Sequence, residues 1–198
     1  MKFSFAECPC DIFICDIIED ASLCRSEREE RALRALLDEA FGTEAERRHT
    51  CAGAPVLYIG GRRSVIGISV SHSRRHAVLA VVPPGVSAGV DVEAPRAQLA
   101  TVAERVLSAD EYDFFSSFDG GFLLAWTLKE ALYKASRILL DSEPCFASQL
   151  RIPVGDDPLA RAFDRDGNVV GSFSAIWCTL PDGEIVTVVF TKRSQNLQ

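Results

Sequence analysis

Two acidic side chains, Asp91 and Glu93, alternate with valines in the segment GVDVE at residues 89–93. Successive side chains of an extended chain point to opposite faces, so the two carboxylates lie on one face. Two unpaired carboxylates repel each other, and a cation between them removes that repulsion. Ligand sets made only of oxygen favour Mg2+, with Mn2+ as the alternative. The segment therefore predicts either a divalent metal site or an edge strand that carries solvated acids.

A second group of chemical side chains lies in WTLKEALYK at residues 126–134. Glu130 and Lys134 are four positions apart, so they share one face of a predicted helix. By themselves they form an ion pair that contributes a few tenths of a kcal/mol to the helix. Next to the acidic pair at 91 and 93, they favour the metal site over the edge strand with solvated acids. The apolar stripe predicted to be buried on this helix is Ala125, Leu128, Leu132, Ala135 and Leu139.

The segment SVSHS at residues 69–73 ends a β-rich run and is followed by Arg74 and Arg75. Hydroxyl, imidazole and guanidinium groups occur together here, so the segment predicts a local anion site. Ser71 and His72 are placed in the turn of a hairpin, where His72 either donates to a phosphate oxygen or bonds to the backbone.

A further acid, Glu111, follows Ser108 at the spacing of an S-x-x-E capping box. In such a box the acid accepts a hydrogen bond from the backbone at the start of the helix. Capping explains Glu111 adequately, and a catalytic role is the other interpretation.

The overall composition limits the classes of partner. A net charge of -7 and a pI near 5.0 argue against a broad nucleic-acid surface, so anionic ligands must meet local clusters of Arg and Lys. The seven cysteines include no CxxC pair, which predicts reduced thiols and a cytoplasmic location. Acids interrupt the N-terminal apolar run, and no stretch is long enough to span a membrane, so neither a signal peptide nor a membrane partner is expected.

These residues must be positioned by helices and hairpins that occur twice along the chain. Apolar spacing predicts a helix over 23–41, and the next hairpin pairs 65–70 with 77–82. A second helix over about 122–140 precedes a hairpin of 173–180 and 185–190. We therefore expect an α+β fold with two pseudo-symmetric lobes, about 1–87 and 88–198, each a long helix on a small antiparallel sheet.

Taken in order, SVSHS, GVDVE and WTLKEALYK resemble the three signature motifs of the 4'-phosphopantetheinyl transferase superfamily. The order, spacing and length are similar to the surfactin-synthetase-activating type, a monomer with two pseudo-symmetric halves. The resemblance implies Mg2+-dependent transfer of the phosphopantetheine arm of coenzyme A to a serine of an apo acyl or peptidyl carrier protein.

The resemblance also implies roles for matching positions. Implied metal ligands are Asp91, Glu93 and Glu130. Implied contacts to coenzyme A are His72, Ser71, Lys129, Lys134, Arg28, Arg31, Gly53 and Pro55. Implied catalytic groups are Glu130, Lys134 and Glu111, and candidates for a basic docking rim are Arg74, Arg75 and Arg137. The chain departs from the family at Gly53-Ala54-Pro55, where many relatives have lysine in the middle position.

Several alternatives stay open at this stage. Glu130 is either a metal ligand or the base that deprotonates the carrier serine. The same acids could serve a magnesium-dependent pyrophosphohydrolase with water as nucleophile, and from a different class the chain could only bind carrier proteins or coenzyme A. The carrier protein and its pathway are not encoded in these short motifs.

Overall fold

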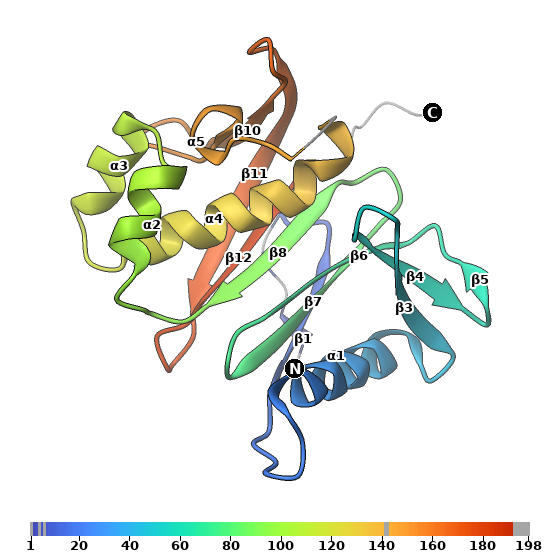
Figure 1. Ribbon diagram of the computed structural model, residues 1–198. Helices are drawn as coiled ribbons and strands as arrows, with labels where there is room; N and C mark the ends of the chain where they lie inside the picture. The colour runs from blue at the N-terminus through green and yellow to red at the C-terminus, as the bar shows by residue number, and fades with distance from the viewer. Residues whose placement is uncertain (1, 4, 6, 141–142, 192–198) are drawn as a thin grey trace. The chain divides into compact units, whose positions relative to one another are not determined.

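The computed structural model describes residues 2, 3, 5, 7–140 and 143–191. The chain divides into two compact units, Met1–Val86 and Ser87–Lys192. Residues 192–198, which the second predicted lobe includes, lie outside the described part. All described strand pairs are antiparallel, so the predicted α+β class is confirmed (Figure 1). Among the described residues, no helix is both long and apolar enough to cross a membrane.

The first unit contains one long helix and two sheets. In chain order its elements are β1 (Lys2–Phe3), β2 (Asp11–Asp16), α1 (Arg25–Phe41), β3 (Ala45–His49), β4 (Pro55–Ile59), β5 (Arg62–Arg63), β6 (Gly67–His72) and β7 (His76–Val82). The larger sheet has the order β1-β2-β7-β6, and the smaller one has the order β3-β4-β5. Helix α1 buries Leu33, Leu36 and Leu37 against side chains of β2 and β7, including Phe13 and Leu79.

Helix α1 begins and ends where its sequence supplies backbone partners. The side chain of Glu27 accepts a hydrogen bond from the backbone nitrogen of Cys24 at 2.7 Å, which satisfies a donor at the helix start. At the other end Gly42 adopts φ = 81°, a left-handed conformation that favours glycine. The helix predicted over 23–41 is confirmed, with its first residue at Arg25.

The hairpin of the first unit differs from its prediction at Ser71 and His72. These residues were predicted in the turn, but they belong to β6 and pair with Val78 and Ala77 of β7. The hydroxyl of Ser73 accepts hydrogen bonds from the backbone nitrogens of residues 75 and 76, at 3.0 and 2.9 Å, and closes a short turn. Because the turn is short, the pairing of β6 with β7 extends through His72.

The second unit contains the other long helix on a five-stranded sheet. In chain order its elements are β8 (Ala88–Glu93), α2 (Leu99–Val106), α3 (Ala109–Ser116), α4 (Gly121–Ser136), the 3-10 helix η1 (Arg137–Leu139), α5 (Phe146–Gln149), β9 (Leu150–Arg151), β10 (Leu159–Phe163), β11 (Val169–Thr179) and β12 (Ile185–Phe190). The strand order is β8-β12-β11-β10-β9, and α4 lies along the sheet (Figure 1).

The last turn of α4 corrects part of the predicted apolar stripe. Leu139 was expected to be buried, but it is 39% exposed because the α-helix ends at Ser136 and continues as a 3-10 turn. Ala125, Leu128, Leu132 and Ala135 are buried, as the spacing predicts. They belong to the main core cluster of the second unit.

One order of elements occurs in both units. In the first, strand β2 precedes helix α1, and the hairpin β6–β7 follows, with β7 paired to β2. In the second, strand β8 precedes helix α4, and the hairpin β11–β12 follows, with β12 paired to β8. The helix and hairpin of each half were predicted, whereas the strand at Asp11–Asp16 that completes the first repeat was not.

Candidate functional site

Gly89 allows β8 and α4 to approach each other closely enough to form a site. A Cβ at this position would lie 2.1 Å from the backbone oxygen of Ala131, 2.7 Å from the nitrogen of Ala135 and 2.8 Å from Cβ of Lys134. A side chain would fit there only if β8 and α4 moved apart, because the nearest atoms belong to the backbone of the helix. The glycine of the GVDVE segment is therefore required by packing against the helix.

Across this contact, Lys134 of α4 pairs with Asp91 of β8. Its Nζ donates to Oδ1 of Asp91 at 2.8 Å and to the backbone oxygen of Val90 at 3.0 Å. Asp91 is only 3% exposed although β8 is the last strand on one side of its sheet. The alternative of an edge strand with solvated acids is therefore wrong for Asp91.

Glu130 and Glu93 complete an acidic cluster around Asp91. Burial, together with the negative charge of Asp91, raises the pKa of Glu130 to about 7. Burial also raises the pKa of Glu93, against the opposing effect of a hydrogen bond from Trp126. The three acids thus influence one another electrostatically, which is the arrangement that a bound cation would stabilise.

Three side chains of α4 form a row facing the acids of β8. They are Trp126, Glu130 and Lys134, spaced four residues apart on one helix face. Trp126 Nε1 donates to Glu93 Oε1 at 3.0 Å, as Lys134 does to Asp91. Sequence reasoning placed Glu130 and Lys134 on one face but missed Trp126, although the same spacing includes it.

The donor set fits Mg2+ chemically, since it consists of three carboxylates with mutual repulsion and no sulfur or imidazole. The acids are not gathered into a finished metal geometry, however. Among the described residues, Asp91, Glu93 and Glu130 are not a group in which one ligand atom from each lies within 4.8 Å of the others. Two of the acids instead use an oxygen to accept from Lys134 and Trp126, and an ion would compete with these donors.

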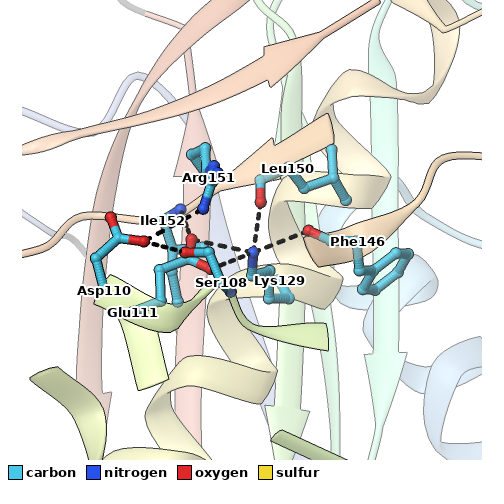
Figure 2. A network of polar contacts seen from close by, with 8 residues as sticks. All are labelled: Ser108, Asp110, Glu111, Lys129, Phe146, Leu150, Arg151 and Ile152. Carbon is cyan, nitrogen blue, oxygen red and sulfur yellow. Dashed lines mark hydrogen bonds and ion pairs between the residues drawn. The ribbon is translucent and has the colours of Figure 1, made fainter. Parts of the chain in front are cut away.

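The adjacent residue Lys129 points away from this cluster into a buried network with Glu111, drawn in Figure 2. Its Nζ lies 3.0 and 2.8 Å from the two carboxylate oxygens of Glu111 and donates to the backbone oxygens of Phe146 and Leu150. Glu111 also accepts from the backbone nitrogens of Ser108 and Ile152, both at 2.8 Å. The side chains of Lys129 and Glu111 are 0% and 1% exposed.

These contacts give Lys129 and Glu111 a structural role. The capping box predicted from Ser108 and Glu111 is confirmed at the start of α3. Burial lowers the pKa of Lys129 to about 8, although the charge of Glu111 opposes that shift. A contact between Lys129 and coenzyme A, or proton transfer by Glu111, would require the network to open, so both roles stay predictions.

The basic residues predicted to bind an anion lie in the first unit. A cavity of about 290 Å³ is lined by Ile17, Arg25, Arg28, Glu29 and Arg74. Glu29 Oε1 accepts from Nε of Arg25 at 2.6 Å and lies 3.4 Å from Nδ1 of His72, which holds these side chains close together. Nε of Arg28 is buried, and no described atom accepts a hydrogen bond from it. The cavity therefore offers guanidinium donors to an anion.

Sequence reasoning included Arg28, His72 and Arg74 in predicted anion sites but gave Arg25 no role. Arg25 precedes Arg28 by three positions, a spacing that puts both on one helix face and could have identified it. Arg74 reaches the cavity from the turn between β6 and β7, which only the fold reveals.

The other predicted coenzyme A contacts are more dispersed in the first unit. Arg31 is exposed and pairs with Asp20 at 3.3 Å. Ser71 is 8% exposed within β6. Gly53 adopts φ = 76° in the turn before β4, a left-handed conformation that favours glycine, and Pro55 begins that strand.

Comparison with known proteins supports the family resemblance for part of the chain. The family model of the 4'-phosphopantetheinyl transferase superfamily matches residues 87–178. The matched segment carries Gly89, the acidic cluster, Lys134 and the Lys129–Glu111 network, and it lies within the second unit. A comparison with curated proteins finds no match. Residues 87–178 of the second unit are thus similar to 4'-phosphopantetheinyl transferases.

Proposed function

We propose that this protein transfers the 4'-phosphopantetheine arm of coenzyme A to a serine of an apo acyl or peptidyl carrier protein. The observation that carries the proposal is the acidic cluster of β8 and α4, located within the segment that matches the transferase superfamily. The reaction would release adenosine 3',5'-bisphosphate. Within the superfamily we propose the two-lobed, surfactin-synthetase-activating type acting as a monomer, on the basis of the repeated strand, helix and hairpin.

We further propose that Asp91 and Glu93 hold Mg2+, or Mn2+ in its place, and that Glu130 lies beside them as an acid that does not bind the ion. The bound ion would neutralise charge on the pyrophosphate of coenzyme A during transfer. Burial and repulsion within the acidic cluster support this assignment, because these carboxylates are held together at a cost that a cation offsets.

Glu130 is proposed as the base of the reaction. The serine oxygen forms a bond to the phosphorus of the pantetheine phosphate, the bond from that phosphorus to the nucleotide phosphate breaks, and the serine proton passes to Glu130. A base works best when its pKa lies near the working pH, and burial raises the pKa of Glu130 to about 7. Lys134, beside Asp91, is proposed to neutralise the leaving nucleotide.

For the nucleotide part of coenzyme A, which leaves as adenosine 3',5'-bisphosphate with two phosphate groups, we propose the arginine cavity of the first unit. Arg28 supplies a buried Nε donor there. Glu29 also lines the cavity, and its Oε1 lies 3.4 Å from Nδ1 of His72. The segment Gly53-Ala54-Pro55 lacks the usual lysine, so coenzyme A is expected to bind more weakly than where lysine is present. The transfer chemistry itself does not depend on that lysine.

The transfer assay tests this proposal directly. The protein is mixed with coenzyme A, Mg2+ and each of several apo carrier proteins, and the carriers are weighed by mass spectrometry. We expect a gain of one phosphopantetheine group, lost in Asp91→Asn and retained in the matched control Asp113→Asn, whose side chain is exposed on α3.

Two results would overturn the proposal in favour of its rivals. Release of nucleotide from coenzyme A without any carrier would indicate a pyrophosphohydrolase. Stable binding of carriers or coenzyme A with no mass gain in any carrier would indicate a binding protein.

A further inference from the structure

A carboxylate that binds a metal must be held in one orientation, and Glu93 has two neighbours that do so. Trp126 donates its Nε1 hydrogen to Glu93 Oε1 at 3.0 Å. A guanidinium nitrogen of Arg96 lies 3.7 Å from the same oxygen. Among the described residues, the hydrogen bond and the ion pair of Glu93 both end on Oε1, which leaves Oε2 as its ligand atom.

Trp126 is itself fixed by its surroundings. Its ring stacks on Phe146 at a centroid distance of 6.4 Å, and the guanidinium carbon of Arg96 lies 5.6 Å from the ring centroid. Arg96 thus contacts both the carboxylate and the ring that donates to it. The three side chains of Glu93, Trp126 and Arg96 form one interlocked group.

The position of Trp126 on α4 explains why a neutral donor occurs beside Glu93. Along one face of α4, Trp126 contacts Glu93 and Lys134 contacts Asp91, with Glu130 between them. A neutral N–H donor orients Glu93 without competing strongly for its charge, whereas a lysine at that place would neutralise it. The row therefore holds both acids of β8 without placing a positive charge of α4 directly on Glu93.

We propose that Trp126 and Arg96 are positioning residues that hold the Glu93 carboxylate in the orientation in which it binds the divalent cation. This inference rests on the metal site of the proposed function. Partners of metal ligands commonly contribute 10-fold to 100-fold in metal affinity. Trp126→Phe, which keeps an aromatic ring on Phe146 but removes the donor, is expected to weaken binding within that range.

The test measures binding of Mn2+ alone to the full chain, by the loss of its free electron paramagnetic resonance signal. Trp126→Phe should weaken binding about 10-fold to 100-fold. Arg96→Gln should weaken it by at most about fivefold, because its ion pair with Glu93 is long and partly exposed. The matched controls are Trp177→Phe and Arg105→Gln, both at exposed positions of the same unit, and they should bind as the wild type does. Circular dichroism checks that each variant is folded.

A second measurement leaves Trp126 unchanged. The chain has two tryptophans, so the Trp177→Phe protein reports the fluorescence of Trp126 alone. Addition of Mn2+ should quench that fluorescence in a saturable way, and Asp91→Asn should abolish the saturable part. This readout tests whether the cation binds beside Trp126, and it does so even if Trp126→Phe does not fold.

Wild-type Mn2+ affinity in folded Trp126→Phe, or Trp126 fluorescence that does not respond to Mn2+, would overturn the inference. Absence of Mn2+ binding by the wild type would overturn it together with the proposed metal site. If the wild type binds Mn2+ and Trp126→Phe binds it weakly, while no carrier is ever modified, the positioning role stands and the transferase proposal fails.

Discussion

Gly89→Ala is the substitution that most directly tests how the candidate site is built. The added Cβ would begin 2.1 Å from the backbone oxygen of Ala131, and real Cβ atoms essentially never approach closer than 3.0 Å. The strand and the helix must therefore separate by close to 1 Å. Overpacking of this kind typically costs about 1–3 kcal/mol of stability.

The separation acts on the site because its contacts cross from β8 to α4. Lys134 reaches Asp91 over 2.8 Å, and Trp126 reaches Glu93 over 3.0 Å, so neither contact tolerates such a shift. A displacement of about 1 Å at a reacting group can cost on the order of 10²-fold in rate. We expect Gly89→Ala to remain folded but to lose about that much of its transfer rate.

The assay is the initial rate of carrier modification, followed by mass spectrometry, with thermal unfolding and Mn2+ affinity measured on the same samples. Gly67→Ala is the matched control, because it also adds a methyl group to a strand glycine but meets only Val82, at 3.3 Å. A Gly89→Ala rate within twofold of the wild type would refute the reasoning that this close contact sets the site geometry.

Four further predictions concern Lys129, Glu130 and Arg28. Lys129→Met should lower the free energy of unfolding by about 3–5 kcal/mol, because it leaves the buried charge of Glu111 unpaired. In urea unfolding, the double variant with Glu111→Gln should recover part of this loss. If the two substitutions had additive effects on the free energy of unfolding, the pairing would be contradicted. Burial raises the pKa of Glu130 from its usual 4.5 to about 7, so between these values the folded state binds more protons than the unfolded state, and stability falls as pH rises. In EDTA the wild type should thus lose up to about 3 kcal/mol relative to Glu130→Gln between pH 4.5 and pH 8, and parallel stability curves would disprove the shift. The same Glu130→Gln variant should transfer about 10²-fold to 10⁴-fold more slowly with Mn2+ affinity near that of the wild type, whereas a large loss of affinity would make Glu130 a metal ligand instead of the base. Arg28→Gln should raise the KM for coenzyme A at least severalfold with little change in kcat, and an unchanged KM would place the nucleotide elsewhere.

Local patterns predicted much of the fold. Apolar spacing located both long helices, and the turn Pro181-Asp182-Gly183-Glu184 lies between strands where it was expected. Period-2 alternation predicted that Asp91 and Glu93 share a face, but it could not predict that the strand is buried at four central positions. Burial depends on what packs against the strand, and that information lies in other parts of the chain.

The unpredicted parts of the site depend on partners distant in sequence. The resemblance gave Lys129 the same role toward coenzyme A as Lys134, yet its acceptors lie 17 to 21 residues away at Phe146, Leu150 and Glu111. Likewise, Trp126 is 33 residues from Glu93, and its indole hydrogen bond could not be inferred from helix periodicity alone. Sequence spacing identified the chemical groups, while tertiary contacts decided which of them face the cluster.

The buried network of Lys129 and Glu111 also has a consequence for how the second unit opens. It connects the start of α3, the middle of α4 and the segment at residues 146–152 through polar atoms that are shielded from water. If one of these segments opened alone, Lys129 or Glu111 would stay buried without its charged or hydrogen-bonded partner. The segments should therefore open together as a single cooperative unit. Native-state hydrogen exchange would then give the amides of Tyr112, Leu132 and Ile152 similar opening free energies, so the helix that carries Glu130 and Lys134 should open together with α3 and the segment at residues 146–152.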